Sequence, residues 1–285
     1  MAVSQSFALA DNSTLANFKA WAQLISNAFS AFGWVKSSDT GQVVWTSIAA
    51  TPAVSTFVYE IWTMNDSFSS TAPVFVKVEY GTGTTSTFPN MAITVGTGSN
   101  GAGALTNAGT RTLCGPLSSG GIATTYECDF SGNAGRIAFT MWRGYTSPMF
   151  FSIERSHDGS GNDLATYVTY LISGNAALTP FCYQQTIFPS ANGGPLFYEK
   201  FGLTLQTGNT TATFANSVAV SPFWPFVGKL DNPMMGAVCI KDGDFSDGAQ
   251  FGVTLFGASH NYLVVKTTLG SWGNQTTNGI AMRYE

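Results

Sequence analysis

Charged side chains are scarce in this sequence. Asp, Glu, Lys and Arg make up 10% of the 285 residues, whereas they form about a quarter of an ordinary soluble domain. The 12 Lys and Arg residues are scattered along the chain, and the formal net charge is -4. A surface that binds the phosphate backbone of a nucleic acid requires clustered basic side chains, so we expect no nucleic-acid partner.

Long apolar runs are also missing. No stretch approaches the roughly twenty apolar residues of a membrane-spanning helix, so the sequence predicts no membrane span. The first residues, Met1–Phe7, contain neither a basic segment nor a long apolar one, which predicts that there is no signal peptide. We therefore expect the chain to fold in a cytoplasm or to be released by cell lysis.

Cysteine and histidine are too few for a disulfide scaffold or a zinc site. The chain has 4 Cys and 2 His, and no two cysteines form a C-x-x-C pair. We expect no cofactor, and we expect the cysteines to be buried as small hydrophobic residues. A Cys114–Cys128 disulfide is the best exception, because these two residues flank a Gly- and Ser-rich stretch. The other two cysteines are Cys182 and Cys239.

Glycine and phenylalanine, in contrast, are abundant, with 31 and 22 copies. Ser, Thr, Asn and Gln supply most of the polar surface. This mixture is typical of a large β-protein with many tight turns, and it is common in proteins that function packed against other copies. A chain of 30.2 kDa is long enough to bury a sizeable core.

One segment has the apolar periodicity of a helix. Apolar residues recur at steps of three and four from Leu15 to Phe32, which predicts an amphipathic helix over about residues 13–32. Asp11-Asn12-Ser13 offers N-cap side chains, and Gly33 is placed to end the helix. A single helix with so much aromatic surface is expected to cover one face or end of a sheet.

After Gly33 the apolar period changes to two, which indicates strands. We expect a β-hairpin formed by Trp34–Lys36 and Gln42–Trp45 around a five-residue loop. The predicted fold class is mainly β, an antiparallel β-sandwich or jelly-roll-like architecture with one N-terminal helix. The further predicted strands are Phe57–Met64, Val74–Tyr80, Met91–Val95, Arg136–Trp142, Met149–Glu154, Ala165–Ile172, Leu196–Leu205, Thr213–Val220, Gly236–Ile240, Phe251–Phe256, Leu263–Thr268 and Ile280–Tyr284.

The segment Ser173–Pro180 is the best position for a domain boundary. It separates residues 1–175, which hold the helix and a β-sandwich, from residues 176–285, a second β part. The alternative is one continuous domain, because β-sandwiches contain such loops internally. The glycine-rich stretch Gly96–Gly121 is expected to be a long surface loop that contacts a neighbour, or to be mobile in isolation.

No constellation of residues predicts catalysis, and we expect a protein that is not an enzyme. Ser156-His157-Asp158 contains the residue types of a catalytic triad, but neighbouring residues of an extended chain point to opposite sides. We interpret these three residues as a polar turn after a strand. The glycine loops at Gly81–Gly83 and Gly96–Gly103 precede no helix, so phosphate binding is not predicted for them.

Two Asp-rich turns have oxygen ligands at the spacing that calcium loops use. These are Asp158–Asp163 and the set Asp242, Asp244 and Asp247. Neither ends with the acidic residue that an EF-hand requires, and Gly- and Asp-rich turns give the same pattern for backbone reasons. We therefore predict no metal site; if an ion binds, the second set brings more charge.

The segment Pro222–Phe226 contains three aromatic residues and two prolines. The prolines make it a poor central strand. It is either packed under the core or a contact surface for another subunit, and its candidate interface residues are Phe223, Trp224 and Phe226. Trp224 or Trp272 offers a stacking platform for a host surface glycan, against the alternative that both are packing residues.

Ordered phrases in the first part of the chain resemble a known group of proteins. With the helix and its Gly33-Trp34-Val35 exit, they are similar to a group of tailed-bacteriophage virion structural proteins. The resemblance reaches from the helix to Asp158 and includes no catalytic signature. The phrases are Tyr59–Asp66 (YEIWTMND), Ala72–Gly83 (APVFVKVEYGTG), Pro89–Gly98 (PNMAITVGTG), Gly101–Gly103 (GAG) and Phe151–Asp158 (FSIERSHD).

The resemblance implies a component of a virion, assembled in the cytoplasm of the bacterial host. Its partners would be copies of itself and other virion proteins, with a host surface glycan as a further option. The aromatic helix and the Gly96–Gly121 stretch suit docking on a tail, baseplate or fibre attachment. The alternatives are a capsid decoration protein and a tail protein that binds or degrades a receptor glycan.

Overall fold

The computed structural model describes most of the chain as strands joined by short connections. In it, 53% of the residues lie in strands and 10% are helical, so the predicted mainly antiparallel β fold with one N-terminal helix is confirmed. The described residues are 1–9, 14–83, 89–114, 124–143, 146–158, 160–174, 179–186, 197–199, 220–223, 226–227, 230–231, 234–241, 245–266 and 278–285.

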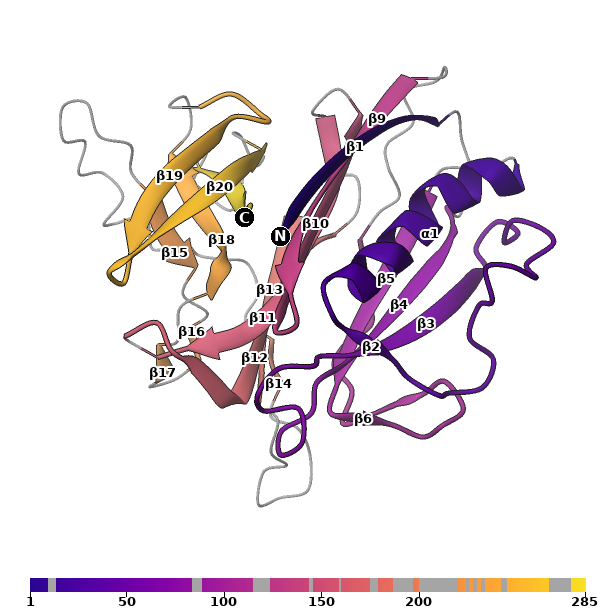
Figure 1. The fold of residues 1–285 in the computed structure, drawn as a ribbon, viewed down its shortest axis with the longest axis horizontal. Helices are drawn as coiled ribbons and strands as arrows, with labels where there is room; N and C mark the ends of the chain where they lie inside the picture. Colours follow the sequence, from indigo (N-terminus) through magenta and orange to yellow (C-terminus); the bar gives the residue numbers. More distant parts are fainter. Residues whose placement is uncertain are drawn as a thin grey trace.

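Three large sheets and two short two-stranded ones make up most of the described residues (Figure 1). A central seven-stranded antiparallel sheet has the order β1-β9-β10-β11-β12-β13-β14. Its strands are β1 (Ala2–Leu9), β9 (Thr124–Asn133), β10 (Arg136–Arg143), β11 (Thr146–His157), β12 (Asp163–Gly174), β13 (Thr179–Thr186) and β14 (Phe197–Glu199).

Helix α1 (Leu15–Ala31) and a five-stranded sheet lie on one side of the central sheet. The order of this sheet is β2-β3-β4-β5-β8. Its strands are β2 (Val35–Lys36), β3 (Phe57–Thr63), β4 (Phe75–Thr82), β5 (Pro89–Gly96) and β8 (Thr112–Leu113). A two-stranded ribbon, β6 (Gly98–Ser99) and β7 (Leu105–Thr106), follows β5.

A C-terminal five-stranded sheet lies on the other side (Figure 1). Its order is β15-β18-β21-β20-β19. Its strands are β15 (Val220–Phe223), β18 (Met234–Lys241), β19 (Gln250–Leu255), β20 (Ala258–Lys266) and β21 (Asn278–Arg283), and β16 (Phe226–Val227) pairs with β17 (Leu230–Asp231) nearby in sequence.

The helix begins at a different cap from the expected one. Thr14, not a residue of the 11–13 segment, is the N-cap, and its Oγ1 accepts the Asn17 N–H at 3.1 Å. Thr14 has extended backbone angles, which place its hydroxyl over the first turn. The expected C-terminal glycine is confirmed: Gly33 has φ +90°, and its N–H donates to Ser30 O.

The apolar face of α1 covers the core, as its periodicity predicts. Phe18, Trp21 and Phe29 are fully buried. The ring of Phe29 stacks on Trp62 of β3 at 5.4 Å and lies 6.2 Å from Phe151 of β11, measured between centroids. The helix therefore fills the space between the central sheet and the β2–β8 sheet.

The predicted hairpin between Trp34–Lys36 and Gln42–Trp45 is wrong. Val35 pairs with Thr63 of β3, and residues 42–45 form no strand. The Gln42 side chain accounts for the difference, because its Nε2 donates to Ser37 O at 2.8 Å and its Oε1 accepts the Ile61 N–H at 2.8 Å. This side chain takes the place of ladder bonds and holds the segment beside β3.

Most other predicted strands are present with shifted ends. The strands that were not predicted are β1, β9, β13 and the two-residue strands β6, β7, β8, β16 and β17. Predicted strand Leu196–Leu205 is described only at Phe197–Glu199, and Thr213–Val220 only at Val220. The division at residues 175 and 176 falls in the connection between β12 and β13, which are paired neighbours. That division stays a prediction.

The two faces of the central sheet differ in character. Along β10, Ile137, Phe139 and Met141 belong to the core shared with α1. The alternate residues Arg136 and Thr140 are also buried, but they lie on the opposite face, because side chains alternate along a strand. The central sheet thus turns an apolar face to α1 and a partly polar, buried face to the C-terminal sheet.

Candidate functional site

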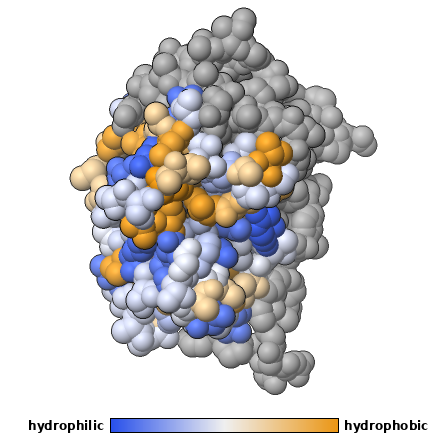
Figure 2. All heavy atoms as spheres, turned by 90° about the vertical axis from the view of Figure 1, so that its right-hand side faces the viewer, coloured by the Kyte–Doolittle hydropathy of each residue, from blue (hydrophilic) through white to orange (hydrophobic). Residues whose placement is uncertain are grey.

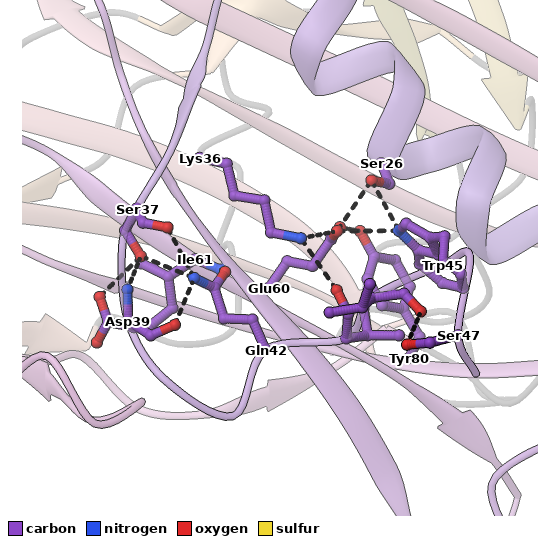
Figure 3. Close-up of polar contacts among 12 residues, drawn as sticks. Ser26, Lys36, Ser37, Asp39, Gln42, Trp45, Ser47, Glu60, Ile61 and Tyr80 are labelled. Atoms are coloured by element: carbon purple, nitrogen blue, oxygen red, sulfur yellow. Dashed lines mark hydrogen bonds and ion pairs between the residues drawn. The ribbon is translucent and has the colours of Figure 1, made fainter.

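The most connected polar cluster surrounds Glu60, a fully buried residue of β3 (Figure 3). Its Oε1 accepts hydrogen bonds from Ser26 Oγ at 3.0 Å, Lys36 Nζ at 2.7 Å and Trp45 Nε1 at 2.9 Å. Its Oε2 accepts the Tyr80 hydroxyl at 3.1 Å. Four donors from four parts of the chain therefore meet one carboxylate.

This cluster compensates the charge that it buries. A buried carboxylate is tolerated when a cation and hydrogen-bond donors surround it, and Lys36 supplies the cation. Burial and the neighbouring Glu60 charge raise the pKa of Tyr80 well above its ordinary value, so its hydroxyl remains a donor. The cluster ties α1, residues 36–45, β3 and β4 together. A single acid among apolar residues of the predicted strand Phe57–Met64 was the available sequence signal.

A second carboxylate, Asp39, fixes the glycine-rich loop at Gly96–Gly103. Its oxygens accept Ser37 Oγ and Ser99 Oγ, each at 2.7 Å, and the Gly103 N–H at 3.0 Å. Burial acts to raise the pKa of Asp39, but these hydrogen bonds hold it below its ordinary value. The loop N–H thus binds a carboxylate of the same chain, in agreement with the structural interpretation of this glycine loop.

Glycine is required where this loop meets its neighbours. Gly103 has φ +90°, and a Cβ on it would lie 2.1 Å from the Tyr59 hydroxyl. The carbonyl of Gly103 also accepts Lys77 Nζ at 2.8 Å, and Lys77 lies 4.2 Å from the centroid of the Tyr59 ring. Of the expected loop Gly96–Gly121, the described residues 96–114 are thus anchored to the body of the protein.

A third cluster joins the central sheet to the C-terminal sheet. The buried Glu154 of β11 accepts the N–H groups of Met235 and Gly236 of β18, the latter at 2.8 Å. His157 lies between two carboxylates, with Nε2 3.5 Å from Glu154 Oε2 and Nδ1 3.1 Å from Asp163 Oδ1. Burial acts to lower the pKa of His157, but the two carboxylates raise it to about 10. The imidazolium therefore balances the buried Glu154 charge.

The structure does not assemble Ser156, His157 and Asp158 into a triad. Ser156 Oγ shares a 2.6 Å hydrogen bond with Thr169 Oγ1 of β12, whereas His157 contacts Glu154 and Asp163. The interpretation as a polar turn is wrong for Ser156 and His157, which end β11 and are buried. Ser156 and His157 contact Thr169 and Asp163 of β12, and these contacts extend β11 beyond its apolar part. Only Asp158 belongs to the turn.

The Asp158–Asp163 turn uses its oxygen atoms internally. Asp158 Oδ1 accepts the N–H groups of Ser160 and Asn162 at 2.8 and 2.9 Å, and Oδ2 accepts Asn162 Nδ2 at 3.0 Å. Among the described residues, no group of three or more His, Cys, Asp or Glu side chains is arranged to hold a metal ion. Asp242 and Asp244 lie outside the described residues; Asp247 precedes β19.

The Cys114–Cys128 disulfide is absent: both cysteines are free and buried. Cys114 Sγ donates to the carbonyl of Phe150 at 2.9 Å, which directs it to β11. Burial and the nearby Asp129 raise the pKa of the Cys128 thiol well above its ordinary value, so it is not a reactive thiolate. For these two residues the prediction of buried, unbridged cysteines is correct. Cys182 and Cys239 lie in β13 and β18, and their side chains are outside the description.

The predicted interface residues are only partly described. Phe223 ends β15 and Phe226 begins β16, whereas Trp224, and likewise Trp272, lie outside the described residues. β15 is an edge strand, and its register shifts between Pro222 and Phe223. This placement agrees with the expectation that the prolines exclude the segment from a sheet centre.

The described surface exposes few large apolar side chains. Figure 2 shows apolar residues forming a patch among polar ones on the face that lies at the right of Figure 1. Val35, Val44 and Val54, all from the segment between α1 and β3, are exposed. No described helix is long and apolar enough to cross a membrane.

Comparison with the models of known protein families gives no match to this chain, and comparison with curated proteins gives none either. The site therefore has to be interpreted from its own residues. The clusters of Glu60, Asp39 and Glu154 each satisfy a carboxylate with donors from distant parts of the chain, and each joins two or more structural elements.

Proposed function

We propose that the chain is a structural component of a tailed-bacteriophage particle and acts through protein–protein contacts. The observation that carries the proposal is the series of ordered phrases from Tyr59 to Asp158, which resembles a group of virion structural proteins. The proposed partners are copies of the chain and other virion proteins. The proposed location is a particle assembled in the host cytoplasm.

The use of the buried polar groups supports this proposal. Glu60, Asp39, Glu154 and the ion pair of Arg155 with Asp66 all connect separate elements of the fold. Arg155 Nε lies 2.6 Å from Asp66 Oδ2, and its Nη2 donates to Ala72 O at 2.7 Å. Such cross-links suit a protein that has to keep its shape under load in an assembly.

We place the protein at the tail, baseplate or fibre attachment. The support is the exposed Val35, Val44 and Val54 between α1 and β3 and the glycine-rich ribbon β6–β7 at the surface, which suit docking on a multi-part assembly. The aromatic face of α1, expected to serve in docking, gives no support because it is buried in the core. In this position the C-terminal segment with Phe223, Trp224 and Phe226 would contact a neighbouring subunit.

Mass spectrometry of purified particles tests the class of function. The chain should be present in mature virions at a fixed ratio to the major structural proteins, and its absence would overturn the proposal. Labelling with an antibody against the chain, followed by electron microscopy, tests its position. Label at the tail is expected, whereas label spread over the head would assign the chain to capsid decoration.

A binding assay separates a purely structural role from host recognition. The isolated protein is mixed with host cells before phage is added, and adsorption is measured. Unchanged adsorption is expected for a structural component. Competition that is lost on replacing Trp224 or Trp272 by Ala would favour the glycan-binding alternative.

A further inference from the structure

The edges of the three large sheets are not equally protected against further strand pairing. Natural sheets protect their edges with short strands, prolines, bulges or charges. Among the described strands, β2 and β8 have two residues each and β14 has three. β15 carries Pro222 and a register shift. β19 is shorter than β1, with six residues, and Gly252 in its interior weakens it as a strand.

β1 has none of these protections. It is eight residues long, Ala2–Leu9, and contains no charge, proline or glycine. It pairs with β9 in one continuous register from Ala2–Ser131 to Leu9–Thr124. No other described strand pairs with its outer side. An uncharged edge strand of this length is a ready template for another strand.

The hydrogen-bond pattern tells which residues of β1 direct their main-chain groups outward. Met1 and Gly132 exchange both hydrogen bonds, each at 3.0 Å. Because bonded and non-bonded pairs alternate in an antiparallel ladder, Val3 and the other odd residues bond to β9. The outward main-chain groups therefore belong to the even residues, which are Ala2, Ser4, Ser6 and Ala8.

These even residues are all small, and the strand reads almost the same in both directions. The sequence Ala-Val-Ser-Gln-Ser-Phe-Ala is symmetric in character about Gln5. A second copy in antiparallel orientation would place Ser4 opposite the partner's Ser6 and Val3 opposite the partner's Phe7. Each such pair joins residues of the same kind, and the even residues would form the bonded pairs, as their outward groups require.

Exposure at the start of β1 supports this geometry. Val3 is 41% exposed and Met1 is 66% exposed, although Val3 lies opposite the buried Phe130 of β9. Val3 is thus at the open margin of the apolar face that α1 covers. A strand added to β1 would extend that face and remove Val3 from water.

We propose that β1 is a self-pairing edge, through which two copies of this chain join their central sheets antiparallel about a two-fold axis at Gln5. An isologous contact of this kind needs only one surface on each copy. The absence of charge in β1 removes the like-charge repulsion that would otherwise oppose pairing of identical strands. The inference does not depend on the proposed virion role.

A proline substitution tests the hydrogen bonds of this edge. Ser6→Pro removes an N–H that points away from β9, so the β1–β9 ladder keeps its bonds. Two intermolecular hydrogen bonds are lost by symmetry, and the dimer dissociation constant in sedimentation equilibrium should rise by roughly thirtyfold. Ser6→Ala is the matched control and should dimerise like the wild type.

A cysteine at the axis tests the register. In the proposed dimer Gln5 and the partner's Gln5 form a non-bonded pair, with Cα atoms about 4.5 Å apart, within the range of a disulfide. Gln5→Cys should therefore give a cross-linked dimer on mild oxidation. Ser6→Cys places the two thiols two residues out of register and should cross-link far more slowly, and the wild type reports any background from the native cysteines.

Two results would overturn the inference. One is a wild type that stays monomeric at every concentration measured. The other is a dimer that Ser6→Pro leaves unchanged and that Gln5→Cys does not cross-link; such a dimer uses another surface, and loss of that dimer in Phe223→Ser/Phe226→Ser would locate it in the C-terminal segment. Absence of the chain from virions would end the proposed function but leave this test as it stands.

Discussion

Glu154 in β11 accepts the N–H of Gly236 in β18 at 2.8 Å, and Gly236 lies so close to β11 that an added side chain would displace its neighbours. A Cβ at this position would lie 2.7 Å from Ser152 Oγ and 2.8 Å from Glu154 Oε2. The contact joins the central sheet to the C-terminal sheet through backbone donors and a buried carboxylate. This contact therefore contributes to holding the C-terminal sheet against the central sheet.

Gly236→Ala should loosen the C-terminal sheet. To fit the methyl group, either the Ser152 hydroxyl and the Glu154 carboxylate or β18 itself has to move. Either change weakens the hydrogen bonds to Glu154 and should cost about 1–3 kcal/mol of unfolding free energy. Urea unfolding followed by far-UV circular dichroism measures this. Gly252→Ala in β19 is the matched control, because a Cβ there meets nothing closer than 3.5 Å. Equal losses in both variants would contradict the steric explanation.

Glu60→Gln should destabilise the layer formed by α1, β3 and β4. The amide brings two N–H groups into a site where Ser26, Lys36, Trp45 and Tyr80 already donate, so at least one donor loses its acceptor. We expect a loss of about 3 kcal/mol in unfolding free energy.

Glu79→Gln is the control for the loss of a charge alone. Glu79 pairs with the exposed Arg111 at 2.7 Å, and such surface pairs contribute about 1 kcal/mol or less. If Glu60→Gln is no more harmful than Glu79→Gln, the Glu60 cluster does not hold the layer together.

Local patterns in the sequence predicted the parts of the fold that depend on neighbouring residues. The periodicity from Leu15 to Phe32 predicted the helix, and Gly33 its end. The alternation in Phe57–Met64 predicted β3. These signals arise from contacts within a few residues, so one sequence is enough to detect them.

Local patterns could not predict which distant strands pair, or where a side chain forms the hydrogen bonds that a backbone ladder would otherwise form. β1 has little contrast between apolar and polar residues, and its partner β9 lies more than a hundred residues away. The Gln42 side chain forms hydrogen bonds in place of the backbone bonds of the expected hairpin. The apolar periodicity of the sequence does not indicate such side-chain bonds. The polar clusters likewise depend on hydrogen bonds between residues far apart in the sequence, such as Asp39 with Gly103 and Glu154 with Gly236.

The stability that His157 contributes should disappear in alkaline solution. In the fold its pKa is about 10, above the ordinary value of 6.5, so the folded state holds a proton that the unfolded chain releases first. The contribution is complete below pH 6.5 and is lost as the pH rises through 10. Unfolding free energies of the wild type and His157→Gln should therefore differ most at pH 6 and converge towards pH 10. A difference that does not change with pH would show that packing, and not charge, accounts for the role of His157.

Asp129 should also make the fold less stable as the pH rises, but over a lower pH range than His157. Burial raises the pKa of Asp129 from 3.8 to about 6. Hydrogen bonds with Ser4 and Tyr284 favour the charged carboxylate, but they do not outweigh burial. The folded state thus binds a proton that the unfolded chain has lost, so the contribution of Asp129 to stability falls as the pH rises from 3.8 to 6 and stays low above that.

Asp129→Asn keeps an acceptor and removes the charge, and it should gain up to about 3 kcal/mol over the wild type at pH 8. The gain should vanish near pH 4, where both side chains are neutral in the fold. Unfolding by urea at the two pH values measures it, and a variant that is less stable than the wild type at pH 8 would contradict the prediction.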